Sequence, residues 1–249
     1  MLRKLVILVV LAVAALAPAA AEAATPVSKA QRELIIVSPD LSQGDAIERG
    51  LYDVIEWSGV GLATATLALR YNVVHILKDG AATRAGFVGK LDDVSGKTSV
   101  RAVDVIFLTH GLDANVLFSN GEFTMNSVRD RILANLTTGQ RAKLRMLFST
   151  ACFGGSHRLA WRAAGFKTVS GSREVYADSA ASYQPFLTSW LAGLNFGLSV
   201  TAANAAGATS PWDGIASTWL LSKGNQFWDD VDSFRLTSGT TSLTIATMP

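Results

Sequence analysis

The stretch AVDVIFLTHG, residues 102–111, is the strongest strand signal in the chain and decides the fold. Its valine, isoleucine, phenylalanine and leucine residues form a nearly continuous apolar run, which is typical of a strand buried on both faces. Such strands occur in mostly parallel sheets that helices cover on both sides. The stretch ends in His110 and Gly111, so a titratable side chain directly follows a buried strand.

A second stretch, KLRMLFSTAC at residues 143–152, has the same form and ends in the single cysteine of the chain, Cys152. In open parallel sheets, functional sites form at the carboxyl ends of the strands. If these two strands are neighbours, their ends bring the imidazole of His110 and the thiol of Cys152 to one edge. The two stretches therefore predict a site built from two strand ends.

The rest of the chain alternates between strand and helix patterns. Strands are expected over 33–40, 72–78 and 166–172, a hairpin over 116–125, and helices over 43–70, 81–96, 126–136, 156–165, 180–195 and 198–206. Gly59 and Gly61 are expected to break the first helix in two, and Asn126 to cap the helix that it begins. This alternation predicts an α/β fold with a mostly parallel sheet and helices on both faces.

The N-terminus has the pattern of a secretory signal peptide. Arg3 and Lys4 precede an apolar run, residues 5–17, and the small-residue site Ala-Glu-Ala follows at 21–23. The apolar run is shorter than the about 20 residues that a membrane span needs. We therefore expect residues 1–23 to be a signal peptide, and the protein to be secreted or periplasmic.

Residues 24–249 have the length of one domain with a full hydrophobic core. Hydrophobic residues make up 49% of the chain and charged residues only 17%, which favours a well-buried globular protein. The formal net charge is only +2, which does not indicate binding to nucleic acid or to an anionic membrane surface. We therefore expect neither as a partner after signal cleavage. Residues 209–249 contain three tryptophans and are expected to be an irregular extension that ends in a strand over 242–247.

A single cysteine in an exported protein is an intermolecular linker, a small buried hydrophobe or a reactive thiol. The place of Cys152 at a strand end favours the reactive thiol, and a redox sensor is disfavoured because the chain has no second cysteine. Three scattered histidines and one cysteine do not have the spacing of a metal site. We therefore expect no metal and no other cofactor.

The chemistry that Cys152 could perform depends on its thiolate. An ordinary cysteine has a pKa of about 8.5, and both a following helix N-terminus and a nearby His110 are expected to lower that pKa. The amides of Gly111 and Cys152 could form an oxyanion hole. Gly154 and Gly155 are expected to keep the space beside the thiol open.

The two stretches together resemble the caspase-like cysteine peptidases of clan CD. VIFLTHG (105–111) matches the strand of these peptidases that ends in His-Gly. MLFSTACFGGS (146–156) matches their strand that ends in Ala-Cys and is followed by a helix. The histidine precedes the cysteine by a distance close to the roughly 50 residues of caspases. Thr150 and Phe153 depart from the caspase signature, so the resemblance is nearer to the legumain, gingipain and CHAT type.

The resemblance implies a caspase-like three-layer sandwich and an exported cysteine endopeptidase that acts on proteins or peptides. It implies that Cys152 is the nucleophile, that His110 is the acid and base, and that the amides of Gly111 and Cys152 hold the oxyanion. A catalytically inactive relative that binds peptides or proteins in the same cleft is the alternative.

The resemblance also implies that the segment SGSREVYAD (170–178) forms a wall of the substrate pocket. Ser170 and Glu174 are candidate substrate-binding residues within it. Glu174 or Asp178 could select a basic side chain, and Arg173 an acidic one. The alternative is that these are solvated loop charges.

His157 is a second candidate base, because it follows Cys152 by five residues. A helical residue there is expected to face away from the thiol. A nucleophile elbow of the serine-hydrolase or glutaminase type would need glycine two residues before Cys152, where this chain has Thr150.

Overall fold

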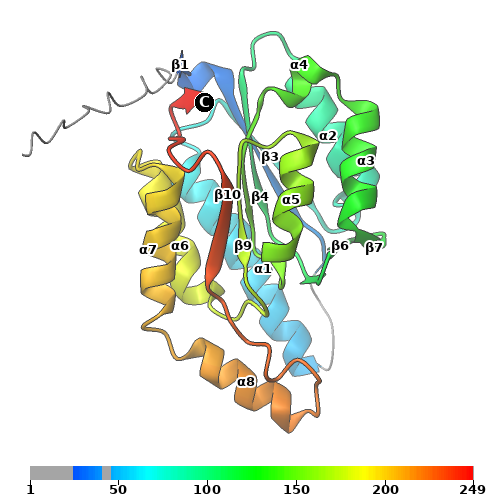
Figure 1. Ribbon diagram of the computed structural model, residues 1–249, viewed down its shortest axis with the longest axis vertical. Helices are drawn as coiled ribbons and strands as arrows, with labels where there is room; N and C mark the ends of the chain where they lie inside the picture. Colours follow the sequence, from blue (N-terminus) through cyan, green and yellow to red (C-terminus); the bar gives the residue numbers. More distant parts are fainter. Residues whose placement is uncertain (1–24, 41–45, 249) are drawn as a thin grey trace, which may run out of the picture.

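The computed structural model describes residues 25–40 and 46–248, and its centre is a six-stranded sheet (Figure 1). The strands are β2 (Arg32–Ser38), β3 (Val73–Lys78), β4 (Ala102–Phe107), β8 (Leu144–Ser149), β9 (Thr168–Ser172) and β10 (Arg235–Gly239). Their spatial order is β10-β9-β8-β4-β2-β3, and only the β10–β9 pair is antiparallel. The predicted mostly parallel sheet is confirmed, and β4 and β8 are neighbours. The predicted signal peptide, residues 1–23, lies outside the described residues.

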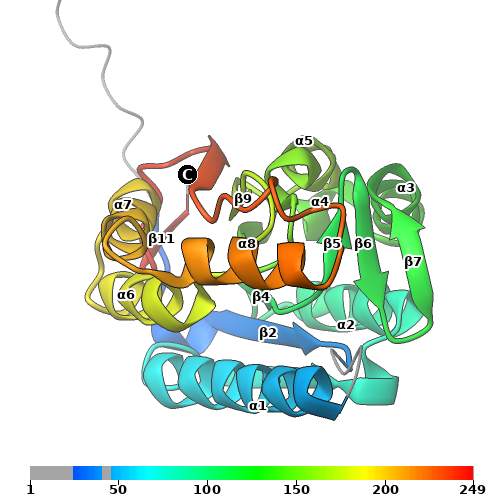
Figure 2. The ribbon, with the colours of Figure 1, turned by 90° about the horizontal axis from the view of Figure 1, so that it is seen from below.

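Helices cover both faces of this sheet, as Figure 2 shows from one end. One face carries α2 (Arg84–Gly96), α3 (Met125–Asn135) and α5 (Gly154–Ala164), and the other α1 (Ala46–Leu67), α6 (Ser179–Leu191) and α7 (Phe196–Gly207). Each face has its own hydrophobic cluster. Phe87, Phe107 and Trp161 belong to the first, and Phe148 and Trp190 to the second. The predicted three-layer arrangement is confirmed.

Smaller elements complete the described chain. They are η1 (Lys29–Gln31), η2 (Asp79–Ala81), α4 (Thr138–Arg141), α8 (Trp212–Ser222), the pair β1 (Thr25–Pro26) and β11 (Thr247–Met248), and the three-stranded sheet β5 (Gly111–Leu112), β6 (Asn115–Phe118) and β7 (Gly121–Thr124). The β5–β7 sheet follows the end of β4, and Figure 2, which views the molecule from below, shows it on the near side together with α8. The carboxyl ends of the parallel strands therefore point to this lower end.

Two local predictions differ from the structure. Helix α1 runs through Gly59 and Gly61 without a break, and Gly59 packs so closely that a Cβ would lie 3.2 Å from a methyl of Leu108. Close packing therefore offsets the helix-breaking tendency of glycine. Helix α3 is capped by Thr124, whose hydroxyl accepts from the Ser127 amide at 3.3 Å, and not by Asn126.

The C-terminal tail is more ordered than the sequence predicts. It supplies α8 and the edge strand β10, which pairs with β9 along its whole length. The strand expected over 242–247 is wrong: only Thr247 of that range is in a strand, the two-residue β11. Buried Arg145 donates to the carbonyls of Ile245 at 3.1 Å and Thr247 at 2.7 Å, so a guanidinium satisfies acceptors that a strand partner would otherwise take.

Arg145 also belongs to a buried ion pair near the amino ends of the strands. Its guanidinium pairs with Asp104 of β4, and both side chains are fully buried. The Tyr71 hydroxyl donates to Asp104 at 2.6 Å and accepts from the Trp190 indole at 3.0 Å. Burial, followed by the charge of Asp104, raises the pKa of Tyr71 well above its ordinary value. Four polar side chains thus satisfy one another inside the apolar core.

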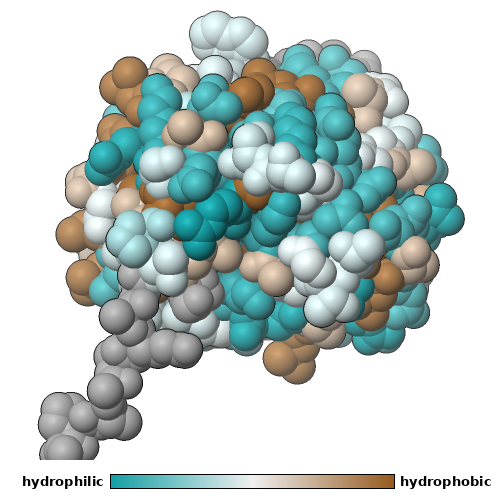
Figure 3. All heavy atoms as spheres, turned by 90° about the horizontal axis from the view of Figure 1, so that it is seen from above, coloured by the Kyte–Doolittle hydropathy of each residue, from teal (hydrophilic) through white to brown (hydrophobic). Residues whose placement is uncertain are grey.

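The two ends of the molecule differ in surface character. Hydrophilic residues predominate on the upper end (Figure 3). At the lower end, α8 has no buried residue and exposes Trp212, Ile215 and Trp219. Within the part of the chain that the structure describes, no helix combines the length and the apolar character that crossing a membrane requires.

Candidate active site

The ends of β4 and β8 bring His110 and Cys152 to the same edge of the sheet. Phe107 pairs with Ser149 in the last row of the ladder, and the Thr150 amide continues it by donating to the Phe107 carbonyl at 2.9 Å. His110 and Cys152 each follow that row by three residues. Both side chains are half-buried. The register therefore places imidazole and thiol at equivalent positions beyond two neighbouring strands.

Gly111 packs directly against the cysteine turn. A Cβ at Gly111 would lie 2.7 Å from the carbonyl oxygen of Cys152 and 3.0 Å from the Cβ of Ala151. Real Cβ atoms do not approach a backbone oxygen so closely, so this position requires glycine. The segment that carries His110 is therefore held against the segment that carries the thiol.

This close approach predicts a specific loss in Gly111→Ala. Since the added Cβ meets backbone rather than a flexible side chain, the loop must move, and a shift of 1 Å at a catalytic group can cost about 10²-fold in rate. For the peptidase activity that the resemblance implies, we expect kcat/KM to fall by about that factor. The matched control is Gly61→Ala, where a Cβ has no neighbour within 4 Å. A Gly111→Ala protein with the rate of the wild type would contradict the packing described here.

A small cavity opens beside the histidine. It has a volume of about 110 Å³ and is lined by His110, Gly111, Leu112, Leu117 and Glu122. Leu117 and Glu122 come from the β5–β7 sheet, which the predicted hairpin at Asn120–Gly121 closes. The hairpin therefore forms one wall of the space in front of His110.

The turn at Cys152 is fixed from the loop after β9. Phe153 has a left-handed backbone with φ of 54°, and its amide donates to the carbonyl of Glu174 at 2.8 Å. The Tyr176 amide faces the sulfur of Cys152, with the nitrogen 3.4 Å from Sγ. Two backbone contacts from residues 174–176 thus hold the turn and reach the thiol itself.

The pKa of Cys152 differs from the expectation. Burial raises the pKa of its thiol, while the amides of Tyr176 and of Cys152 itself oppose that rise. The predicted lowering by the helix N-terminus and His110 is therefore wrong for the free protein. The thiol is protonated at neutral pH, so attack on a carbonyl needs a base that removes the proton as the bond forms.

The direction of this shift predicts the pH dependence of alkylation. We expect the rate of reaction with iodoacetamide to rise with a midpoint above the about 8.5 of an ordinary cysteine, because only the thiolate reacts. Since Cys152 is the only cysteine, mass spectrometry of the intact chain reports this rate alone. The same chain unfolded in urea should show the ordinary midpoint. A folded-state midpoint below that of the unfolded chain would contradict the shift.

Gly154 and Gly155 were predicted to keep the space beside the thiol open, and this prediction is wrong. A Cβ at Gly154 would lie 3.1 Å from the Cα of Gly171, and one at Gly155 would lie 2.8 Å from the carbonyl oxygen of Ser172. The two glycines instead let the first turn of α5 pack against β9. Their role is to place the helix that follows Cys152.

The two candidate substrate-binding residues lie in different surroundings. Ser170 is fully buried in β9, and its hydroxyl accepts from Arg235 at 3.2 Å, so it has no surface to offer a substrate. Glu174 is half-buried beside the cysteine turn. Its carbonyl accepts from the Phe153 amide and the Ser172 hydroxyl, both at 2.8 Å. Of the two, only Glu174 adjoins Cys152, and it does so through its backbone.

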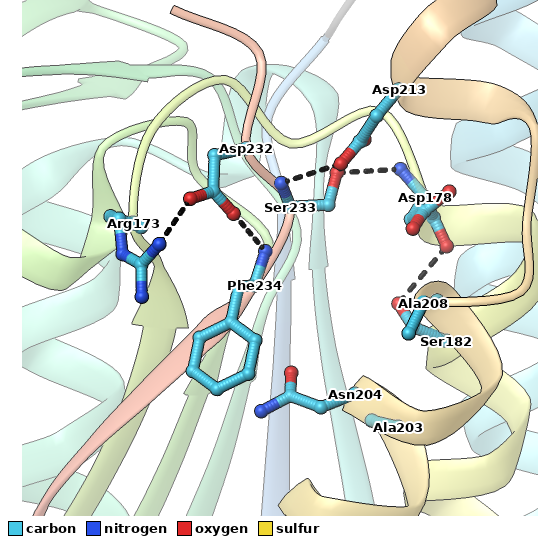
Figure 4. Close-up of a pocket in the computed structure, with 11 residues that line it drawn as sticks. Arg173, Asp178, Ser182, Ala203, Asn204, Ala208, Asp213, Asp232, Ser233 and Phe234 are labelled. Atoms are coloured by element: carbon cyan, nitrogen blue, oxygen red, sulfur yellow. Dashed lines mark hydrogen bonds and ion pairs between the residues drawn. The ribbon is translucent and has the colours of Figure 1, made fainter.

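A larger cavity of about 260 Å³ lies where α6 and α7 meet the loop before β10 (Figure 4). Asp178, Asp213 and Asp232 line it together with Arg173, which pairs with Asp232 at 2.5 Å. Burial, with the charge of Asp213, raises the pKa of Asp178, and a hydrogen bond from Ser210 opposes this. Neither His110 nor Cys152 lines this cavity.

Asp213 and Asp232 were not identified as candidates by sequence reasoning. Both lie in the tail that was expected to be irregular, and they approach Asp178 only because α8 and the loop before β10 fold back beside it. No pattern in the sequence near Asp213 or Asp232 indicates that these side chains lie close to Asp178. Among residues 25–40 and 46–248, no three His, Cys, Asp or Glu side chains gather in a way that could hold a metal ion.

His157 was expected to face away from the thiol, and its ring faces the loop that follows β4. It is fully buried, and its Nε2 lies 2.9 Å from the carbonyl oxygen of Leu112. Its position was predictable from spacing, since His157, Trp161 and Ala164 recur at i, i+4 and i+7 on the buried side of α5. A helix face directed at the sheet also reaches the loop that follows β4.

Comparison with known proteins shows likeness only at the level of structure. No protein-family profile and no curated protein matches the sequence. The crystal structure of gingipain R, an Arg-specific cysteine proteinase, matches with a TM-score of 0.53 and 15% identity over 91% of this chain, which spans 50% of the gingipain chain. Caspase-1 from Spodoptera frugiperda matches with a TM-score of 0.52 and 10% identity, over 91% of this chain and 94% of its own. The chain therefore has the caspase-like fold of the clan CD cysteine peptidases.

Proposed function

We propose that the chain is an exported cysteine endopeptidase that hydrolyses peptide bonds through Cys152 and His110. One observation carries this proposal: His110 and Cys152 each follow the last paired row of the neighbouring strands β4 and β8 by three residues, and Gly111 packs on the cysteine turn. The likeness to gingipain R, a cysteine proteinase, and to caspase-1 supports the same class of chemistry.

In the proposed mechanism, Sγ of Cys152 attacks the carbonyl carbon of the scissile bond while His110 takes the thiol proton. The raised pKa of Cys152 favours this concerted transfer over a stored thiolate. The amides of Gly111 and Cys152 donate to the oxyanion, an effect worth about 10²–10³-fold per donor where measured. The C–N bond then breaks as His110 gives its proton to the leaving amine.

The acyl group now forms a thioester with Cys152. His110 takes a proton from water, and the resulting hydroxide attacks the thioester carbonyl. The C–S bond breaks, the carboxylic acid leaves, and the sulfur regains its proton from His110. Proton transfer of this kind contributes about 10²–10⁴-fold. Each proton that His110 accepts is returned, so the cycle balances without a cofactor.

A peptide-library digest tests the activity. The chain that begins at Ala24 is incubated with a library of denatured proteome peptides, and new termini are identified by mass spectrometry. We expect cleavage that is absent with Cys152→Ala, and the new termini also report the residue that precedes the cut. Retention of peptides on the column-bound chain, without any new termini, would instead support the alternative, an inactive peptide-binding relative.

Export is a separate part of the proposal and rests on residues 1–23. The basic, apolar and small-residue segments follow one another in the order that signal peptidases require. N-terminal sequencing of the chain recovered from the secreted or periplasmic fraction should begin at Ala24. Recovery of the full chain with Met1 in the cytoplasm would contradict export but would leave the proposed chemistry standing.

A further inference from the structure

The first turn of α5 holds the loop that follows His110 through two adjacent side chains. The Ser156 hydroxyl accepts from the Ala114 amide at 2.9 Å and donates to the Phe153 carbonyl at 2.8 Å. The His157 Nε2 lies 2.9 Å from the Leu112 carbonyl oxygen. Since a carbonyl can only accept, Nε2 carries the proton and donates it to Leu112. The helix that begins after Cys152 is thus hydrogen-bonded to the loop that begins after His110.

The ring of His157 also lies close to Gly111. A Cβ at Gly111 would lie 2.9 Å from Cε1 of His157 on one side and 2.7 Å from the Cys152 carbonyl oxygen on the other. Gly111 therefore lies between the imidazole and the cysteine turn, where there is no room for a side chain. A larger ring at position 157 would therefore press on the backbone that carries His110 and the Gly111 amide.

We propose that His157 is a positioning residue that, as a neutral Nε2–H imidazole, fixes the His110–Leu112 backbone against the Cys152 turn. This rests on the proposed function, because the geometry it maintains is that of the proposed acid and base and of the proposed oxyanion donor. In the proposed mechanism His110, and not His157, moves protons. It is fully buried, and no hydrogen-bond partner for its Nδ1 is found among the described residues.

The surroundings of His157 support the neutral ring. Burial lowers its pKa, while the Leu112 carbonyl, the charge of Asp113 and the backbone of Asn115 oppose that change. Trp161, one turn further along the buried side of α5, belongs to the apolar core.

The first measurement needs no variant and no substrate. Nitrogen-15 NMR of the imidazoles at pH 7 should show one neutral ring in the Nε2–H form, with its N–H proton protected from exchange. The His157→Gln protein identifies that signal by its loss. A His157 ring that is protonated at pH 7, or that carries its proton on Nδ1, would overturn the proposal.

The second measurement is amide hydrogen exchange in His157→Phe, which keeps an aromatic ring but removes the donor. We expect exchange within residues 110–117 to rise at least about 10-fold, with β2, β4 and β8 unchanged. Leu159→Ala is the matched control, since Leu159 lies on the same helix and is exposed. Unchanged exchange at 110–117 in a folded His157→Phe protein would overturn the proposal whatever the activity.

The third measurement tests whether the placement of the His110–Leu112 backbone by His157 affects peptide hydrolysis. In His157→Phe we expect kcat for peptide hydrolysis to fall about 10²-fold, with KM changed less than threefold and iodoacetamide labelling of Cys152 near the wild-type rate. His157→Gln, whose amide can still donate to Leu112, should recover most of kcat. If iodoacetamide labelling, kcat and the melting temperature all change together, His157 is merely structural. If the wild type cleaves nothing, the proposed function fails, and the NMR and exchange results still decide the placement.

Discussion

Replacing Cys152 with alanine should lower kcat/KM for peptide hydrolysis by about 10⁴–10⁶-fold, the range seen when members of a catalytic group are removed. The chain has no second thiol that could take over the attack. His110→Ala should cost about 10²–10⁴-fold, because the thiol keeps its place but loses the group that accepts its proton. The measurement is the initial rate on a peptide found in the digest.

The double variant distinguishes a working pair from two independent contributions. If His110 acts only through Cys152, then His110→Ala adds nothing once Cys152 is alanine, so the double variant has the residual rate of Cys152→Ala. Leu159→Ala, on the exposed side of α5, should leave the rate unchanged. Residual activity above a few per cent in Cys152→Ala would show that another group performs the attack.

Removing the charge of Asp104 should be the most destabilising of the changes considered. Asp104→Asn leaves the guanidinium of Arg145 buried without a counter-charge, and breaking a buried pair in this way costs about 3–5 kcal/mol of unfolding free energy. Arg145 also binds the carbonyls of Ile245 and Thr247, so its displacement should release the C-terminal segment. Urea denaturation followed by circular dichroism measures the loss.

A surface pair gives the matched control. Asp130 pairs with Arg129 at 2.8 Å and its side chain is largely exposed, so Asp130→Asn should cost only about 0–1 kcal/mol. In the double change of Asp104→Leu with Arg145→Met, the loss should be smaller than in Asp104→Asn alone, since no buried charge is left. Equal losses at Asp104 and Asp130 would show that the buried pair contributes no more than a surface pair.

The main elements around the site could be predicted because they depend on local pattern. Residues 102–107 and 144–149 form nearly continuous apolar runs, and such runs indicate strands buried on both faces. The neighbouring positions of His110 and Cys152 follow once the two strands pair. Gly165, predicted to end a helix, has φ of 124° at the end of α5, a backbone that glycine adopts most readily.

What could not be predicted depends on contacts between distant segments. Burial raises the pKa of Cys152, and the amide of Tyr176, 24 residues further along the chain, opposes that rise. No sequence pattern near the cysteine indicates its burial or its contact with Tyr176. The edge strand β10 has a mixed sequence, RLTSG, and its place depends on Arg235, which reaches Ser170 and the Ser149 carbonyl inside the sheet. The mid-strand burial of Ser170 likewise follows from β10 covering the edge.

The most direct test of the pairing between His110 and Cys152 compares two reagents on one thiol. A peptidyl acyloxymethyl ketone requires the peptide-binding site and a proton transfer, whereas iodoacetamide requires only an accessible thiolate. For His110→Ala, the second-order labelling rate with the peptide reagent should fall at least about 10²-fold, while iodoacetamide labelling stays within threefold of the wild type. Equal peptide-reagent rates in wild type and His110→Ala would contradict the account.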